Sequence, residues 1–402
     1  MQVCDQESKR RLLGTVMMLG LMIGSLIGGR LSDKFGRKKV MICASLLIMP
    51  LVTFGGYSPN YACYLILHLI YCSALPIVWI CTHSITVEIF DPHYRKIVVI
   101  VKDLVWPIGQ LILTFTVYNV RNWTKLHLVV GAMGLLGLPS FFIVPESPRW
   151  LANNKRKEDA EKVFLTIAKW NKRLELSLKQ RELIRNILNK IEQEAHEVTE
   201  TNLNIINMFK KDNLSKTLII QLNWITMCIG SYTLMLNGTK LSGDIFINFA
   251  LLALFDIPGI FVLMATLKFF GRKFNLFYTQ MILGICCLIL AFLPQTSTKI
   301  ILVFYLIGKS AAGTGFTLVW LVTAEIFPTN LRSQAIGFCS MVSRIFSLVC
   351  PFVATLAIYW GPLPMLVLGV PCLFSGLLVY FLPETKGREL PQNMKDTQEP
   401  EL

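Results

Sequence analysis

Residues 29–39 read Gly-Arg-Leu-Ser-Asp-Lys-Phe-Gly-Arg-Lys-Lys, a short basic stretch between two apolar runs, and its core returns later in the chain. Gly36-Arg37-Lys38 returns after 235 residues as Gly271-Arg272-Lys273. Two more landmarks recur in the same order: Glu88 with Arg95 as Glu325 with Arg332, 237 residues on, and Pro145-Glu146-Ser147 as Pro383-Glu384-Thr385, 238 residues on. This near-constant spacing predicts that the chain consists of two tandem halves.

The composition is typical of a membrane protein. Of the 402 residues, 53% are hydrophobic and 16% are charged, and the mean hydropathy is +0.54. Soluble domains carry about 25% charged residues. The net charge of +14 would suit a nucleic-acid partner, but the basic residues alternate with long apolar runs. We therefore attribute the charge to the excess of Lys and Arg on the cytoplasmic side of membrane proteins, and expect a lipid bilayer and no nucleic acid as partner.

Eleven apolar runs are long enough to cross a membrane as helices, which takes about 20 residues each. They are Leu12–Arg30, Val40–Gly55, Tyr61–Thr82, Ile97–Val120, Thr124–Val144, Lys216–Leu236, Ile245–Lys268, Phe274–Leu293, Ile300–Val322, Gln334–Tyr359 and Leu363–Phe381. The runs predict an all-α membrane protein with two helical halves. Two runs precede Gly271 in the second half and one precedes Gly36 in the first, so we expect a whole helix to be missing at the front.

The chain is expected to have four parts: a first helical half (1–144), a polar linker with amphipathic helices (145–215), a second, six-helix half (216–382) and a tail (383–402). Basic residues concentrate in the short loops on the side of Lys34 to Lys39. The positive-inside rule places that side in the cytoplasm. The linker and the C-terminus are then cytoplasmic, and the N-terminus lies outside.

Charged residues near the predicted cytoplasmic helix ends can pair with one another. Because carboxylate–guanidinium pairs form in one conformation and break in another, we predict that they act as latches between the two halves. An alternative is that the basic residues only anchor the helices at the membrane surface. The predicted latch residues are Gly29, Asp33, Gly36, Arg37, Glu88, Arg95, Glu146, Arg149, Arg272, Glu325, Arg332 and Glu384.

Three ionisable residues, Asp256, Lys309 and Arg344, lie deep inside predicted spans. At 1.5 Å per residue each is about 14–17 Å from a helix end. A charge at that depth costs on the order of 3 kcal/mol, so each should line a wet cavity or have a partner. Asp256 and Lys309 form either a structural pair or part of a substrate site. Arg344 has no obvious spare carboxylate and is predicted to contact substrate.

Three motifs resemble the major facilitator superfamily: Gly29-x-Leu31-x-Asp33-x-x-Gly36-Arg37, Pro145 to Leu151 and Pro383 to Gly387. They suit both its sugar-porter branch and its organic cation/anion/carnitine branch. The organic-ion branch is the closer match through Val3-Cys4-Asp5, Arg121-Asn122-Trp123, Tyr232 to Gly243, Gly308-Lys309 and Thr323 to Thr329. Against that family, about 5 + 6 of an expected 6 + 6 helices are present, and the first helix with its large outer loop is absent.

The resemblance implies a plasma-membrane carrier of small organic ions that works by alternating access and is not an enzyme. It implies no cofactor, and it leaves open a coupling ion such as sodium or a proton, and the oligomeric state. The spacing of His and Cys residues indicates no metal site.

Within that family, cation carriers have an acidic residue where Arg344 stands, whereas anion and carnitine carriers have Arg. One guanidinium can bind one carboxylate through two parallel hydrogen bonds, which favours carboxylate-bearing or zwitterionic, carnitine-like substrates. Aromatic faces are available to a cationic group. The predicted substrate-contacting residues are Arg344, Asp256, Lys309, Tyr232, Gln110, Trp106 and Trp320. The alternatives are an organic-cation carrier, a sugar porter and a truncated membrane protein that does not transport.

Overall fold

The computed structural model describes residues 7–90, 92–171, 182, 184–186, 188–189, 208–209, 211–238, 244–294, 297–327 and 329–386, and all regular elements in these ranges are helices. The first half contains α1 (Glu7–Phe35), α2 (Arg37–Gly55), α3 (Tyr61–Ile89), α4 (Pro92–Asp103), α5 (Val105–Asn119), α6 (Trp123–Met133), η1 (Gly134–Gly137) and α7 (Pro139–Ile143). The linker follows with α8 (Pro148–Asn153) and α9 (Lys157–Trp170). The second half contains α11 (Lys211–Gly238), α12 (Ile245–Phe269), α13 (Arg272–Phe292), α14 (Thr298–Ile326), α15 (Thr329–Ser347), α16 (Cys350–Val353), η3 (Ala354–Ile358), α17 (Leu363–Leu378) and η4 (Val379–Phe381).

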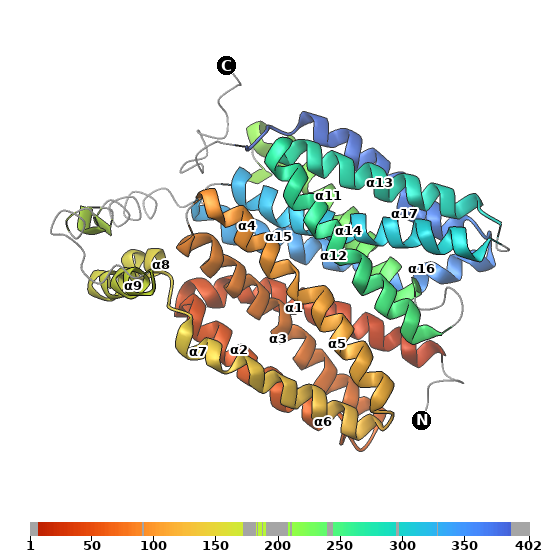
Figure 1. Cartoon of the computed structure of the whole chain (residues 1–402), viewed down its shortest axis with the longest axis horizontal. Helices are drawn as coiled ribbons and strands as arrows, with labels where there is room; N and C mark the ends of the chain where they lie inside the picture. The colour runs from red at the N-terminus through yellow and green to blue at the C-terminus, as the bar shows by residue number, and fades with distance from the viewer. Residues whose placement is uncertain are drawn as a thin grey trace.

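Ten helical stretches of the described chain are long and apolar enough to cross a membrane, and they overlap ten of the eleven predicted spans. The eleventh prediction, Ile97–Val120, is divided between α4 and α5, and each piece is too short by itself. Pro107 has no N–H to donate to the carbonyl four residues earlier, so the helical ladder is interrupted there. Leu104 keeps helical angles (φ −63°, ψ −23°), and α5 continues the path of α4 (Figure 1).

The two halves repeat the same packing. α1, α2 and α3 contact one another as α12, α13 and α14 do, and α2 packs on α6 as α13 packs on α17. Where the halves meet, α1 lies against α15 and α12 lies against α5, so each contact is the counterpart of the other. The helices of both halves run along one another, and α8 and α9 project from one end of the bundle, called here the linker end (Figure 1). Equivalent contacts of this kind are expected when two halves are repeats related by an axis along the membrane normal, as in some transporters.

Close backbone approach within each half depends on glycine. A Cβ at Gly24 of α1 would collide with the backbone carbonyl of Ser73 in α3. The counterpart in the second half is Gly259 of α12, where a Cβ would collide with the hydroxyl of Ser310 in α14. Small residues at such crossings let membrane helices pack through their backbones.

The buried core is unevenly divided between the halves. The largest apolar cluster lies in the second half and includes Trp224, Leu283 and Leu318, each fully buried. A buried amide also links helices there, because Gln280 Nε2 donates to Asn223 Oδ1 at 2.9 Å and to Thr226 Oγ1 at 2.8 Å. A smaller cluster joins the halves and consists of Met18 and Leu21 from α1 with Cys228, Tyr232 and Cys350 from the second half.

Candidate functional site

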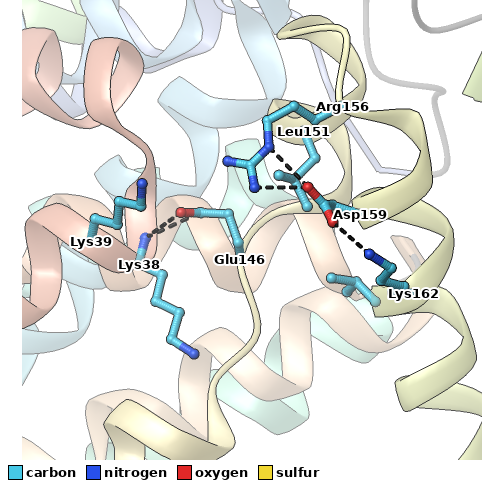
Figure 2. Close-up of a pocket in the computed structure, with 8 residues that line it drawn as sticks. Lys38, Lys39, Glu146, Leu151, Arg156, Asp159 and Lys162 are labelled. Carbon is cyan, nitrogen blue, oxygen red and sulfur yellow. Dashed lines mark hydrogen bonds and ion pairs between the residues drawn. The ribbon is translucent and has the colours of Figure 1, made fainter.

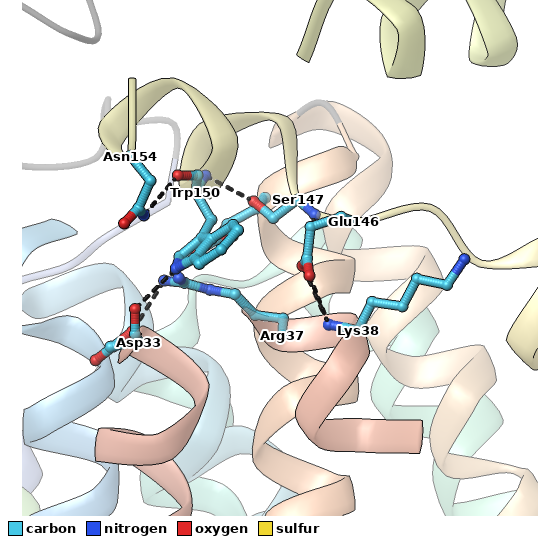
Figure 3. A network of polar contacts seen from close by, with 8 residues as sticks. Asp33, Arg37, Lys38, Glu146, Ser147, Trp150 and Asn154 are labelled. Carbon is cyan, nitrogen blue, oxygen red and sulfur yellow. Dashed lines mark hydrogen bonds and ion pairs between the residues drawn. The ribbon is translucent and has the colours of Figure 1, made fainter. Parts of the chain in front are cut away.

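At the linker end, the turn between α1 and α2 gathers three of the predicted latch residues, Asp33, Arg37 and Glu146 (Figure 3). Gly36 has φ +100°, a conformation that glycine adopts readily, so α2 can begin directly at Arg37. Arg37 Nη2 lies 3.0 Å from Asp33 Oδ1 and 3.3 Å from Glu88 Oε1. One buried guanidinium thus joins the ends of α1 and α3 to the start of α2.

The second half repeats the pair of the arginine with a glutamate and makes more hydrogen bonds in it. Arg272 Nε donates to both oxygens of Glu325, at 3.3 and 3.1 Å, and Nη2 donates to Oε1 at 3.1 Å. The Thr385 hydroxyl also donates to Glu325 Oε2 at 2.5 Å. Bidentate charge-assisted bonds of this kind are stronger and more directional than single ones.

The acidic residues of the two Pro-Glu motifs hold the beginnings of α2 and α13. Glu146 accepts from the backbone N–H of Lys38 at 3.1 and 3.2 Å, and Glu384 accepts from those of Arg272 at 2.8 Å and Lys273 at 3.2 Å. The first N–H groups of a helix have no partner inside the helix and lie at its positive end, so a carboxylate is well placed there.

The linker is tied to the same turn. The Trp150 indole Nε1 of α8 donates to the carbonyl oxygen of Asp33 at 2.7 Å (Figure 3). The Ser147 hydroxyl caps α8 by accepting from the Trp150 backbone N–H at 3.2 Å. Arg149 lies in the first turn of α8, and Gly29 lies in α1.

The described latch pairs lie within each half. Arg37–Glu88 joins helices of the first half, and Arg272–Glu325 joins helices of the second. This is because a Gly-Arg-Lys turn and its Glu-x6-Arg unit belong to neighbouring helices of one repeat. The side chains of Arg95 and Arg332 lie outside the described residues. A role of these pairs in reorientation stays a prediction.

In the membrane region, Asp256 of α12 and Lys309 of α14 form a buried ion pair. Lys309 Nζ donates to Asp256 Oδ2 at 2.7 Å, and the two side chains are 5% and 7% exposed. Asp256 Oδ1 is buried and has no hydrogen-bond partner among the described residues. The pair therefore satisfies Lys309 and leaves one carboxylate oxygen to accept a further bond.

Arg344 of α15 lies between two aromatic rings and is 1% exposed. Its guanidinium carbon lies 4.9 Å from the ring centroid of Tyr232 in α11 and 5.6 Å from that of Phe316 in α14. Its three guanidinium nitrogens are buried, and none meets hydrogen-bond geometry with a described acceptor, although the Tyr232 side chain interacts with the guanidinium. The rings position the cation, and no described carboxylate pairs with it.

The other predicted contacts lie around this centre. Trp320 packs on Trp224 at 5.0 Å between ring centroids, and Trp106 of α5 packs on Trp79 of α3 at 5.8 Å. Gln110 of α5 reaches across to the second half, where its Nε2 lies 3.5 Å from Met235 Sδ. The structure therefore pairs Asp256 with Lys309 and Arg344 with Tyr232, and no described contact joins the two pairs.

Helix α14 carries the side chains that connect these groups. Lys309, Gly313, Phe316 and Trp320 follow at spacings of three and four, so they share one helix face. Lys309 pairs with Asp256, Phe316 faces Arg344, and Trp320 lies 5.4 Å from the ring of His83 in α3. One face of α14 thus borders the ion pair, Arg344 and His83.

Sequence reasoning missed Lys102 and Asp103. It started their span at Ile97, but α4 begins at Pro92, which places Lys102 about 15 Å along the helix. Lys102 Nζ lies 3.8 Å from Asp103 Oδ1 and 3.4 Å from His83 Nδ1. The available signal was two adjacent charges inside an apolar run.

Comparison with known proteins places this architecture in a family. Residues 4–395 match the model of the sugar (and other) transporter family. The chain is 31% identical to the organic cation transporter-like protein of Drosophila melanogaster, over 98% of this chain and 71% of the relative. It is 29% identical to solute carrier family 22 member 13 of Homo sapiens, over 98% of this chain and 70% of the relative.

The fold is also that of a solved transporter. The proton:xylose symporter XylE bound to 6-bromo-6-deoxy-D-glucose superposes with a TM-score of 0.81, at 18% identity, over 99% of this chain and 91% of that chain. This identity shows a shared fold and nothing about substrate. The predicted major facilitator fold is confirmed, as is the prediction of a transporter and not an enzyme. The chain therefore belongs to the sugar (and other) transporter family of the major facilitator superfamily.

Proposed function

We propose that the protein transports small organic ions by alternating access and favours substrates that bear a carboxylate. The observation that carries the proposal is the buried guanidinium of Arg344, whose nitrogens have no described hydrogen-bond partner. An unsatisfied buried donor costs about 1–3 kcal/mol, and a charged one costs more. A substrate carboxylate would supply two acceptors in the geometry that a guanidinium fits.

The balance of central charges supports a monoanionic group. Lys102 has Asp103 beside it, and Lys309 has Asp256. Arg344 is left as the cation without a described carboxylate. A cationic group on a zwitterion would meet the aromatic rings near Arg344, which attract cations through their faces.

Access to Arg344 requires the halves to separate. Arg344 is almost fully buried, and α15 packs against α1 of the other half. Met18 and Leu21 of α1 form part of the apolar cluster that also contains Tyr232. Rocking of one half against the other would open this contact from one side at a time. We place the protein in the plasma membrane, with the linker end and the C-terminus in the cytoplasm.

A second candidate is organic-cation transport. It is favoured by the names of relatives such as the organic cation transporter-like protein of Drosophila melanogaster. The ring pairs Trp79–Trp106 and Trp224–Trp320 near the centre would suit a quaternary ammonium group. Arg344 opposes this candidate, because a buried cation repels a ligand that has no compensating carboxylate.

Uptake into liposomes tests the proposal directly. The purified chain is reconstituted, and radiolabelled carnitine, a monocarboxylate and tetraethylammonium are supplied one at a time. We expect uptake of carnitine or the monocarboxylate to exceed that of tetraethylammonium about tenfold or more. Preferred uptake of tetraethylammonium would favour organic-cation transport over the proposal. A chain that takes up none of the three would fit the non-transporting alternative.

A further inference from the structure

A cavity at the linker end joins two segments that are far apart in the sequence. It encloses about 300 Å³ and is lined by Lys38, Lys39, Glu146, Leu151, Arg156, Asp159, Lys162 and Val163. The two lysines come from the first turn of α2, and the last four residues lie in or beside α9. Figure 2 shows Glu146 between these two groups, with Arg156, Asp159 and Lys162 opposite Lys38 and Lys39. A volume of this size accommodates a small ligand.

The two carboxylates of the cavity are already engaged. Glu146 accepts from the backbone N–H groups of Lys38 and Ser147. Asp159 accepts from Arg156 Nε at 3.0 Å and Nη2 at 2.7 Å, and from Lys162 Nζ at 3.0 Å. The carboxylates are thus held by donors around them, and four basic side chains against two acidic ones leave the cavity with an excess of two positive charges.

Hydrogen-bond donors remain available for an anion. Arg156 keeps its Nη1 group, and Lys162 keeps two of its three N–H bonds. No ion pair is described for the side chains of Lys38 and Lys39 in the described ranges. Several N–H donors around one small concave space fit a tetrahedral oxyanion better than a single carboxylate.

The two α2 lysines that line the cavity are not both repeated in the described part of the second half. Lys38 corresponds to Lys273 in the repeat, but Lys39 corresponds to Phe274, and Lys273 Nζ lies 4.8 Å over the ring of Tyr380. The second half repeats the carboxylate that holds the helix start, through Glu384. Lys39 has no basic counterpart there, so the repeat alone does not account for the basic lining of the cavity.

We propose that this cavity binds a phosphomonoester group, carried either by a phosphoinositide lipid or by a soluble phosphate compound. The basic loops predict that the linker end faces the cytoplasm, where anionic headgroups lie beside the membrane surface. The bound phosphate bridges α2 to α9 and holds the linker on the first half. The site is separate from the membrane centre and does not depend on the transported substrate.

The proposal is tested by binding to the full chain in nanodiscs. One arm uses nanodiscs of phosphatidylcholine with or without phosphatidylinositol 4,5-bisphosphate, and the other adds inositol 1,4,5-trisphosphate to phosphatidylcholine nanodiscs. The readout is the midpoint of thermal unfolding as a function of ligand concentration, which gives an apparent affinity without transport. Stabilisation in the first arm alone identifies a lipid source, and stabilisation in the second identifies a soluble one.

Three variants decide whether the cavity is the site. Lys38→Gln with Lys39→Gln should weaken binding about tenfold, because two of its cations are lost. Asp159→Asn should tighten binding a few-fold, since it removes a negative charge and releases Arg156 and Lys162. Lys273→Gln, at the repeat position of Lys38, should leave the affinity within about twofold. No stabilisation in either arm, or equal losses in the double variant and Lys273→Gln, would overturn the proposal.

Discussion

The two halves share a sequence pattern but differ in how deeply they are buried. In both, the glutamate of the Pro-Glu motif accepts from a backbone N–H of the Gly-Arg-Lys turn. In both, the arginine of that turn pairs with a glutamate of the neighbouring helix. In the first half, between 6% and 33% of each candidate span is buried, and in the second between 28% and 61%. A repeated motif therefore sets local geometry at the helix ends, whereas burial along the helices depends on which neighbours each helix has.

The largest expected difference concerns the ion pairs inside the membrane. Lys309→Ala leaves the buried Asp256 carboxylate without its partner and should cost about 3–5 kcal/mol of stability. Lys102→Ala should cost less, because Lys102 and Asp103 are 32% and 27% exposed and 3.8 Å apart, so the remaining carboxylate is less deeply buried than that of Asp256. Thermal unfolding in one detergent compares the two.

The double variant Lys309→Gln with Asp256→Asn should lose much less stability than Lys309→Ala, because no uncompensated charge remains. If Lys309→Ala and Lys102→Ala were equally mild, burial would not distinguish the two pairs.

The next difference concerns helix crossings. Gly24→Ala should destabilise the protein by about 2 kcal/mol, since its new methyl group meets the backbone carbonyl of Ser73. Gly259→Ala should cost less than about 1 kcal/mol, because the Ser310 hydroxyl that it meets can rotate away. The measurement is the unfolding midpoint of both variants beside the unchanged chain. The reverse order would show that α1 shifts away from α3 more easily than the packing indicates.

A smaller difference is expected between the two arginines at the linker end. Arg272→Lys should lose about 1 kcal/mol more stability than Arg37→Lys, because Lys cannot make the bidentate contact that Arg272 makes with Glu325. Turnover should fall in both variants if the pairs stabilise one access state. Changed substrate affinity with unchanged turnover would contradict the latch role.

The smallest effect belongs to the linker helices α8 and α9, where the Trp150 indole of α8 donates to the first half. Hydrogen bonds from Lys162 and Arg156 lower the pKa of Asp159 below its usual value. A lowered folded pKa stabilises the protein above the unfolded pKa of about 3.9, and this contribution is lost as pH falls through the lower folded value.

We expect the small stability difference between the unchanged chain and Asp159→Asn to stay constant from about pH 8 to 5 and to close below about pH 4. A difference that already vanished at about pH 6 would show that Asp159 is not held by its cationic neighbours.

Much of this architecture could be predicted from sequence because it depends on local signals. Apolar length predicted ten of the spans. The repeat identified Arg272 and Glu325 as the equivalents of Arg37 and Glu88, and the structure pairs each arginine with the glutamate of its own half. The position of Lys102 along its helix could not be predicted, because apolar composition does not show where a helix begins outside the lipid. The cavity beside Lys38 depends on the docking of α9, a contact between segments over a hundred residues apart that no motif encodes.

At the centre, sequence identified the charged residues but did not decide whether Asp256 and Lys309 pair or contact substrate. Asp256 and Lys309 lie in different helices, and their 2.7 Å contact appears only when α12 packs on α14. The same packing leaves Arg344 against Tyr232 without a carboxylate. Helix-face assignments are weak where both faces are apolar, so periodicity carried no information about this pairing.

The central claim is that Arg344 selects carboxylate-bearing substrates, and charge reversal tests it most directly. Radiolabelled carnitine and tetraethylammonium are supplied to liposomes that contain equal amounts of the unchanged chain, Arg344→Lys or Arg344→Asp. We predict that Arg344→Asp loses about thirtyfold or more in carnitine affinity and admits tetraethylammonium better, with Arg344→Lys intermediate. Unchanged selectivity in Arg344→Asp would contradict the account and leave Arg344 a structural residue.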